Sequence, residues 1–165
     1  MSTSIEIKKL KFADLAKLTN LMLELSAYYD GLEDVTLHVA DLNDRKRNKL
    51  DDAKEFIGHG YVWGAFTENF LIGYIAFRLL GPDHHSLPNT VFIAELYVKE
   101  EFRTGGIATR LINRVLQSDF PDKYTRFSVT HSPLEPGLTA FYEKFGFKVL
   151  KVLESGNIAL IRDVN

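Results

Sequence analysis

The chain has 165 residues, a length that suits one domain with a single well-buried core. Apolar residues make up 45% and the formal net charge is −2, which excludes a disordered chain and gives no reason to expect a nucleic acid partner. The chain has no cysteine, so disulfides, thiolate metal sites and a cysteine nucleophile are excluded.

The N-terminal third predicts a strand followed by helical segments. Residues 1–5 lack the charged and then apolar pattern of a secretory leader, and no stretch of the chain approaches the apolar length of a membrane span. We therefore expect a soluble, cytoplasmic protein. Residues 5–10 alternate apolar and charged side chains, as in a half-buried strand.

Two helical segments are expected next. The first begins at Asp14 and carries an apolar stripe at helical spacing, and Gly31 is expected to end it. Residues 32–35 are then expected as a short acidic loop. The highly charged segment 39–56 has few side chains to bury, so we expect an exposed helix or a pair of helical pieces.

The middle of the chain predicts three strands. Residues 61–66 and 71–80 are apolar and flank the turn 67–69, which indicates a hairpin. Residues 81–89 include two prolines and two histidines and are expected as a loop. Residues 90–98 are rich in β-branched and aromatic side chains, which favours a further strand.

The C-terminal part alternates helices and strands and completes the fold class. The expected elements are a helix from Ile107 that stops before Pro121, a strand at 126–131, a helix at 138–145 and a final hairpin of 148–153 and 158–164. This order predicts an α+β fold with a mixed, mostly antiparallel central sheet flanked by helices. We expect residues 1–165 to form one domain.

The loop between residues 98 and 107 has the features of a phosphate-binding turn. It reads Arg103-x-x-Gly106-x-Ala108 and leads from a strand into a helix. A helix N-terminus offers free backbone N–H groups and the positive end of the helix dipole, which together bind a pyrophosphate without a lysine. The sequence lacks the Gly-x-Gly-x-x-Gly and Gly-Lys-Ser/Thr patterns of two other phosphate loops at this place.

Two segments resemble a known superfamily. Arg103 to Ala108 resembles the acyl-CoA loop of GNAT acetyltransferases, and Ala140 to Phe147 resembles their later helix-and-strand motif, with Tyr142 four residues before Gly146. The order of the expected elements is also similar to that of GNAT proteins. The resemblance implies an N-acetyltransferase that uses acetyl-CoA (coenzyme A) as its cofactor, and it favours a homodimer.

The resemblance also implies which residues hold acetyl-CoA. The amides of residues 104–109 are expected to face the pyrophosphate, and the strand edge at 96–98 is expected to pair with the pantetheine arm as a peptide strand would. Alternatively, Gly105 and Gly106 only make a tight connection. The expected cofactor-binding residues are Leu96, Tyr97, Val98, Arg103, Thr104, Gly105, Gly106, Ile107, Ala108, Thr109 and Tyr142.

Acetyl transfer to an amine needs a group that removes a proton from that amine. An amine with a pKa near ~10.4 is neutral at pH 7 only about once in two to three thousand molecules, a cost of roughly 4–5 kcal/mol. A carboxylate can recover part of this cost. Glu95 lies in an otherwise apolar strand, close to where the family often has an acidic residue, so we expect it to act as base or to hold a water. Alternatively, it orders the strand or binds a neighbouring cation.

The departing thiolate needs a hydrogen-bond donor, and the resemblance assigns this role to Tyr142. Proton transfer from a phenol of pKa ~10 to a thiolate of pKa ~8.5 is uphill by only about 2 kcal/mol. The alternative is that Tyr142 belongs to the core, like its neighbour Phe141.

The loop just before Tyr142 departs from the family pattern. Glu135 and Leu138 stand where the family often has asparagine and alanine, so contacts of this loop with pantetheine or acceptor are in question.

The acceptor is expected to be a small amine or polyamine. In GNAT proteins the loop between the first two helices commonly lines the acceptor pocket, and here it offers aromatic rings and carboxylates, which suit a cation. This pattern loosely resembles the diamine acetyltransferase branch. The expected acceptor-binding residues are Tyr28, Tyr29, Glu33, Asp34 and His131.

Several alternatives stay open at this point. One is that His131 serves as a second candidate base, and its counterpart is that His131 only caps the end of its strand. Another is that the acidic residues are solvated loop charges. Two alternatives to a small-amine acetyltransferase are an enzyme that acetylates a protein lysine or N-terminus, and a non-catalytic acyl-CoA sensor. No metal is expected, because His84 and His85 form no ligand pattern with other residues.

Overall fold

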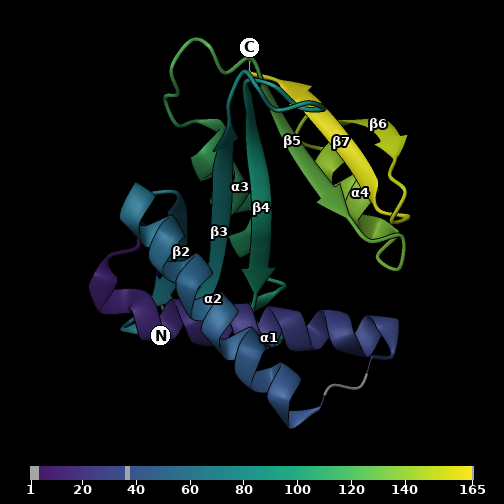
Figure 1. Cartoon of the computed structure of the whole chain (residues 1–165). Coiled ribbons are helices and arrows are strands. Elements are labelled where there is room, and N and C mark those ends of the chain that lie inside the picture. The colour runs from purple at the N-terminus through teal and green to yellow at the C-terminus, as the bar shows by residue number, and fades with distance from the viewer. Residues whose placement is uncertain (1–3, 36–37, 165) are drawn as a thin grey trace. The chain divides into compact units, whose positions relative to one another are not determined.

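The computed structural model describes residues 4–35 and 38–164, which form two compact units. Unit 1 consists of Met1–Ala76 and Glu95–Val115, and unit 2 consists of Phe77–Ala94 and Leu116–Asn165. The ribbon in Figure 1 labels most of the helices and strands of the two units. We describe each unit by itself.

The elements follow the order that the sequence predicts. Unit 1 contains β1 (Ile5–Lys9), η1 (Phe12–Asp14), α1 (Leu15–Glu33), α2 (Val39–His59), β2 (Val62–Thr67), η2 (Glu100–Phe102) and nearly all of α3 (Ile107–Leu116). Unit 2 contains β5 (Arg126–His131), α4 (Gly137–Glu143), β6 (Lys148–Val152) and β7 (Ile158–Asp163). The strands β3 (Phe70–Leu80) and β4 (Thr90–Val98) contribute to both units.

The strands form one seven-stranded sheet in the order β1-β2-β3-β4-β5-β7-β6. The β4–β5 pair is parallel, whereas β1–β2, β2–β3, β5–β7 and β6–β7 are antiparallel. The predicted α+β class with a mixed, mostly antiparallel sheet and flanking helices is therefore confirmed.

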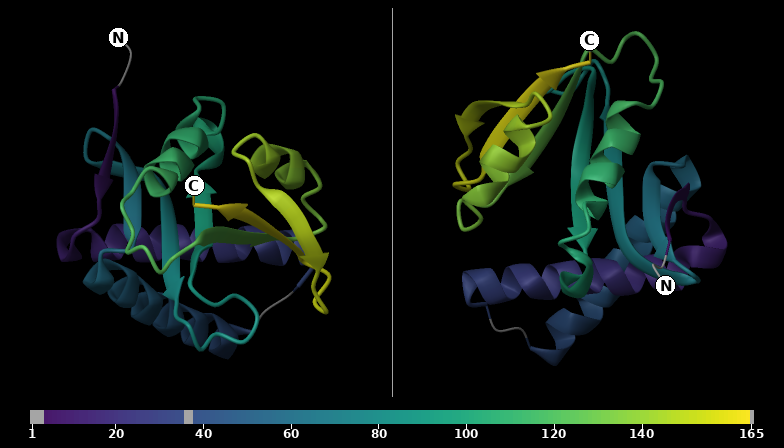
Figure 2. Two further views of the ribbon diagram at one scale, coloured as in Figure 1. Left: turned by 90° about the horizontal axis from the view of Figure 1, so that it is seen from above. Right: turned by 180° about the vertical axis from the view of Figure 1, so that it is seen from behind.

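In unit 1 the helices cover both faces of the strands. Figures 1 and 2 show α1 and α2 side by side on one face and α3 on the other. Leu18, Leu21, Met22 and Leu25 form the buried stripe of α1, as their helical spacing predicts. On the opposite face the Arg114 guanidinium of α3 lies 4.2 Å from the ring centre of Trp63 in β2.

Two local predictions for unit 1 were wrong. Gly31 does not end α1, because a helix-interior glycine costs only about 1 kcal/mol and the helix continues to Glu33. The left-handed residue that ends it is Asp34, with φ 55°, and the Val35 N–H then donates to the Asp30 carbonyl at 2.9 Å. Residues 32 and 33, which were expected to lie in a loop, therefore belong to α1. The charged segment that follows is one continuous helix, α2, the first of the two forms that the sequence predicts.

Unit 2 is a small sheet with one short helix. Residues 90–93 of β4 pair in parallel with residues 126–129 of β5, and β7 lies between β5 and β6. The helix α4 lies beside β6 (Figure 1). It begins at Gly137 and ends at Glu143, so it starts one residue earlier and ends two residues earlier than the sequence predicts. Phe127, Phe147 and Leu160 are buried in this unit.

Candidate functional site

The loop before α3 exposes backbone amides at a helix N-terminus. Gly106 has φ +73°, a left-handed value that favours glycine, and nothing lies within 4 Å of the position a Cβ atom would take. The first bond of the helix runs from the Arg110 N–H to the Gly106 carbonyl at 3.2 Å. The amides of Ile107, Ala108 and Thr109 therefore precede the first intrahelical bond and have no acceptor within the helix.

Arg103 ties this loop to the end of β4. Its Nε donates to the Val98 carbonyl at 2.8 Å. Its guanidinium lies 5.3 Å from the ring centre of Tyr28 and 5.6 Å from that of Tyr97, distances typical of cation–π contacts. Arg103 thus orients the loop through its backbone and aromatic contacts.

Glu24 of α1 makes a second connection to the same end of β4. Its carboxylate accepts a hydrogen bond from the Tyr97 hydroxyl at 3.2 Å and one from Lys99 Nζ at 3.2 Å. Burial and then the charge of Glu24 raise the pKa of Tyr97, although Arg103 opposes the shift. The Tyr97 hydroxyl therefore stays protonated and remains a hydrogen-bond donor.

The predicted base, Glu95, lies beside an ammonium group and a buried tyrosine. Lys49 Nζ of α2 lies 3.9 Å from Glu95 Oε1, and the two side chains are 23% and 16% exposed. Tyr74 of β3 is fully buried. Burial raises the pKa of Tyr74 well above its ordinary value. The negative charge of Glu95 raises this pKa further, and Tyr29 adds a smaller electrostatic contribution. A carboxylate, a cation and aromatic rings meet here within unit 1.

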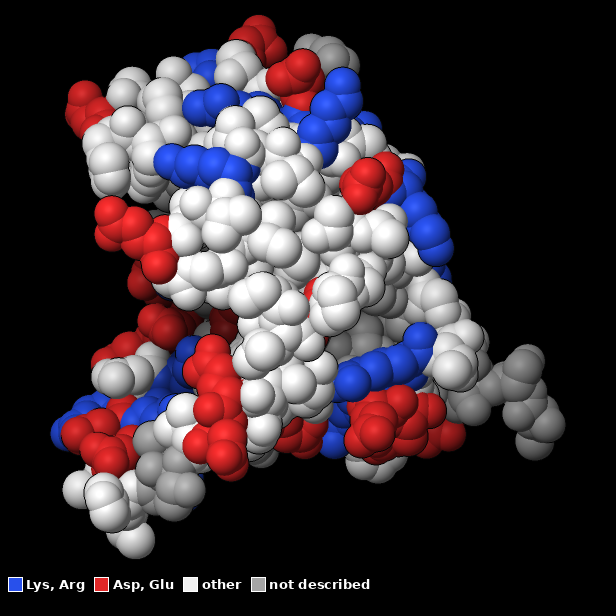
Figure 3. Space-filling view, turned by 90° about the vertical axis from the view of Figure 1, so that its right-hand side faces the viewer, with Lys and Arg blue, Asp and Glu red and all other residues white. Residues whose placement is uncertain are grey.

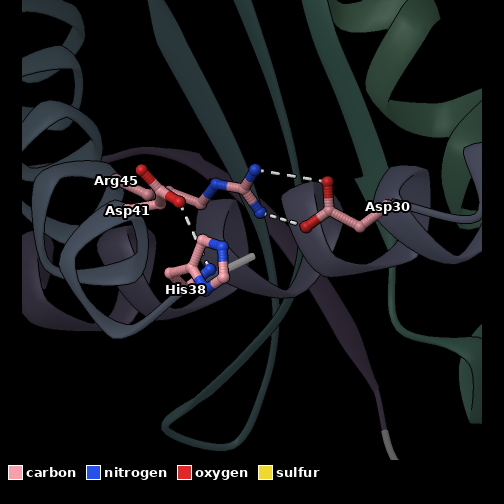
Figure 4. Close-up of polar contacts among 4 residues, drawn as sticks. All are labelled: Asp30, His38, Asp41 and Arg45. Atoms are coloured by element: carbon pink, nitrogen blue, oxygen red, sulfur yellow. Dashed lines mark hydrogen bonds and ion pairs between the residues drawn. The ribbon is translucent and has the colours of Figure 1, made fainter. Parts of the chain in front are cut away.

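A paired aspartate and arginine fix the part of α2 that carries Lys49. The Arg45 guanidinium donates to both carboxylate oxygens of Asp30 in α1, with Nη2 at 3.2 Å from Oδ1 (Figure 4). The same figure shows Asp41 accepting a hydrogen bond from the His38 backbone N–H at the start of α2. Because Lys49 follows Arg45 by four residues, both side chains lie on one face of the helix.

The predicted acceptor residues of unit 1 lie at the end of α1. Tyr28 and Tyr29 are half-buried, with ring centres 5.6 Å apart, whereas Glu33 and Asp34 are exposed. Of these residues, Tyr29 contributes to the raised pKa of Tyr74, and Tyr28 makes a cation–π contact with Arg103. The face in Figure 3 intersperses Lys and Arg with Asp and Glu rather than presenting one sign of charge.

In unit 2, Tyr142 and His131 are stacked neighbours. Tyr142 is buried, and its ring centre lies 6.4 Å from that of His131. His131 Nδ1 lies 2.9 Å from the Ser132 carbonyl and Nε2 lies 2.7 Å from Thr139 Oγ1. A carbonyl only accepts, so Nδ1 carries a proton, and in the neutral ring Nε2 accepts from the Thr139 hydroxyl. His131 thus has a buried hydrogen-bonding role within its own unit.

A comparison with protein families decides the family. The sequence model of the Acetyltransferase (GNAT) family matches residues 22–147, well over half of the chain. The chain belongs to the GNAT family. It is accordingly an acetyl-CoA-dependent N-acetyltransferase.

Solved structures of several other proteins have the same fold. The PaiA N-acetyltransferase of Thermoplasma acidophilum, in complex with coenzyme A, is 20% identical with a TM-score of 0.73, and the match covers 97% of this chain and 99% of that one. PH1933 from Pyrococcus horikoshii is 22% identical with a TM-score of 0.73, over 98% and 99%. NAA60 of Arabidopsis thaliana, in complex with a bisubstrate analogue, is 14% identical with a TM-score of 0.70, over 97% and 98%.

At these identities the structures show a shared fold. The comparison with curated proteins gives no match.

Other features of this GNAT protein are separate from the residues around Glu95. A hollow of about 450 Å³ lies between α1, the β2–β3 turn and η2, and none of the predicted acceptor residues lines it. Within the described ranges, no three His, Asp or Glu side chains come together as a metal site would require. None of the described helices combines the length and the apolar character that crossing a bilayer requires.

Sequence reasoning did not identify two neighbours of Glu95 in this GNAT protein. Lys49 lies in a helix whose charge pattern predicts only a solvated face. Its position four residues after Arg45 predicts that the two side chains share one helix face, but not that they meet Glu95. Tyr74 lies in an apolar run and is indistinguishable there from a core aromatic residue. Both contacts depend on tertiary structure, which sequence periodicity does not report.

Proposed function

We propose that this GNAT enzyme transfers the acetyl group of acetyl-CoA to a small cationic amine, polyamines included. The observation that carries the proposal is the position of Lys49 Nζ, 3.9 Å from the largely buried Glu95 carboxylate, whose charge also raises the pKa of Tyr74. A primary ammonium group therefore already fits beside this carboxylate. Carboxylate and aromatic faces are the groups that attract such a cation.

The residues of the α3 loop fit the pyrophosphate of coenzyme A. The exposed amides before the first helical bond are donors, and the open space around Gly106 lets a phosphate approach the backbone closely. We assign this group to residues 104–109 and the pantetheine arm to the backbone of Leu96 to Val98. The coenzyme A complex of the similar PaiA N-acetyltransferase supports coenzyme A as the ligand.

In the proposed reaction Glu95 prepares the acceptor. Acetyl-CoA supplies the acetyl group as a thioester. Glu95 takes a proton from the acceptor ammonium, directly or through a water, which leaves the nitrogen lone pair free to form the new N–C bond. The acceptor's cationic charge favours binding at this carboxylate.

The leaving group receives its proton from Tyr142 in the same proposal. As the C–S bond breaks, the Tyr142 hydroxyl donates a proton to the departing sulfur, and the acylated nitrogen loses its second proton, which restores the Tyr142 hydroxyl. The products are coenzyme A, the N-acetylated amine and the proton held by Glu95. This role rests on the family motif that surrounds Tyr142. The second candidate base, His131, is less suited, because both of its ring nitrogens already have partners within unit 2.

A thiol-release assay tests the proposed function. Wild-type protein and acetyl-CoA are incubated with diamines, polyamines, amino acids and lysine peptides, and free coenzyme A is measured. We expect release with small diamines or polyamines, a loss of about a hundredfold or more in kcat for Glu95→Gln, and an unchanged dissociation constant for acetyl-CoA. The matched control is Glu6→Gln, because Glu6 is an exposed glutamate on β1.

Release only with peptides would overturn the small-amine acceptor. Wild-type turnover in Glu95→Gln would overturn the base. Three further expectations remain predictions: a single domain over residues 1–165, a cytoplasmic location and a homodimer.

A further inference from the structure

Tyr74 has a buried hydroxyl that packing does not explain. The residue is fully buried. By volume it is among the largest of the fully buried side chains that the structure describes. Among residues 4–35 and 38–164, no group makes a hydrogen bond of good geometry with its hydroxyl. A buried hydroxyl without a partner is costly, so each such group requires a reason. Phenylalanine would fill the same space without that cost.

The Tyr74 side chain lies on the face of the sheet that also carries Glu95. The Lys99 N–H donates to the Ile72 carbonyl at 2.8 Å, which places the start of β3 beside the end of β4. The rings of Tyr74 and Tyr97 lie 6.4 Å apart, so these two side chains share one face of the sheet. Glu95 precedes Tyr97 by two residues and therefore lies on the same face.

Close backbone packing supports this arrangement. A Cβ atom on Gly73 would lie 2.9 Å from the Tyr97 carbonyl oxygen, a distance that real side chains do not reach. Only glycine therefore lets β3 approach β4 this closely beside Tyr74. The same packing keeps Tyr74 near the Glu95 carboxylate, whose negative charge raises the pKa of the Tyr74 hydroxyl.

We propose that Tyr74 is a positioning residue for Glu95. Its hydroxyl donates a hydrogen bond to the Glu95 carboxylate and fixes the carboxylate when the acceptor ammonium takes the place of Lys49. Catalytic hydrogen bonds are often long in the absence of substrate and shorten in the productive complex. The inference rests on the proposed function, because it assigns Glu95 the role of base.

Two other groups near the pair have contacts of their own. Tyr97 points its hydroxyl to Glu24, and Lys49 approaches Glu95 from α2. Lys49 is the cation that the acceptor is expected to displace. Tyr74 comes from the rigid interior of β3, so its hydroxyl does not move away with the helix.

The test is the acceptor kinetics of Tyr74→Phe. We expect kcat to fall about tenfold or more, because the free energy of a hydrogen bond to a charged group corresponds to about that factor in rate. The acetyl-CoA dissociation constant and the acceptor KM should change by less than threefold. The melting temperature should not fall, because the variant removes an unsatisfied hydroxyl and keeps the ring. The matched control is Tyr124→Phe, because Tyr124 is also a buried tyrosine but belongs to unit 2, whereas Tyr74 belongs to unit 1.

A double variant separates positioning from a structural role. If Tyr74 acts through Glu95, then Tyr74→Phe combined with Glu95→Gln should turn over no more slowly than Glu95→Gln alone. Wild-type kcat in Tyr74→Phe, or additive losses in the double variant, would overturn the inference. If Glu95→Gln itself keeps wild-type turnover, the assignment of the base fails, and the inference fails with it for that separate reason.

Discussion

The Arg45 guanidinium and the Asp30 carboxylate form a two-point ion pair that joins α2 to the end of α1. Both side chains are 23% exposed, so water screens the pair less than it screens most surface pairs. The hydrogen bond that Arg45 donates to Asp30 raises the pKa of Arg45, and burial opposes the rise. The pair sets the position of the α2 face that presents Lys49 to Glu95.

A double-mutant cycle of Asp30→Ala and Arg45→Ala should show this coupling. We expect a coupling free energy of about 1 kcal/mol in urea denaturation followed by circular dichroism, because the pair is bidentate and partly buried. The control cycle uses Asp44 and Arg47, whose side chains are 63% and 70% exposed, and should give a value near zero. Equal coupling in the two cycles would show that geometry and burial add nothing to the pair.

Replacement of Gly106 by alanine should weaken acetyl-CoA binding. A left-handed conformation at φ +73° costs an alanine about 1–2 kcal/mol, and relief of this strain would turn the loop amides away from the pyrophosphate. We expect the dissociation constant to rise about fivefold to thirtyfold in calorimetry. Gly105→Ala is the control, because its nearest neighbouring atom would lie at an ordinary 3.7 Å. A larger loss in Gly105→Ala would contradict the prediction.

Removal of the Lys49 charge should improve the binding of a cationic acceptor. Lys49 and the acceptor ammonium compete for the Glu95 carboxylate, so Lys49→Met should lower the acceptor KM about threefold to tenfold. The measurement is the KM of the best amine at fixed acetyl-CoA. Lys46→Met, at an exposed lysine of the same helix, should leave KM unchanged. A rise of KM in Lys49→Met would indicate that Lys49 binds the acceptor instead of competing with it.

The fold was predictable because its elements have regular periodicity. The alternation of residues 5–10 predicts the half-buried strand β1, and the stripe of Leu18, Leu21 and Leu25 predicts the buried side of α1. The end of α1 was not predictable in the same way. Gly31 is a usual stop signal, but its local cost is small, and the left-handed stop falls on Asp34 instead.

The candidate site was predictable only where one residue stands out from its surroundings. Glu95 is an acidic residue in an apolar strand, and Gly106 belongs to a short motif, so both were found from sequence. Lys49 and Tyr74 meet Glu95 from distant parts of the chain, and neither differs from its sequence neighbours in type. Contacts of this kind depend on how α2 and β3 pack, which a single sequence does not encode locally.

The buried hydroxyl of Tyr74 should make the protein unstable at alkaline pH. The pKa of this tyrosine is raised in the folded protein, whereas the unfolded chain loses its proton near pH ~10. Above that pH the folded state binds more protons than the unfolded state, so the free energy of unfolding falls by about 1.4 kcal/mol per pH unit from this group. Below pH ~10 both states are protonated, and the group gives no pH dependence. Urea denaturation of wild type and Tyr74→Phe between pH 9 and 11.5 should therefore diverge only above pH ~10, with the variant declining less steeply. Parallel curves would show that the Tyr74 hydroxyl ionises equally easily in the folded protein.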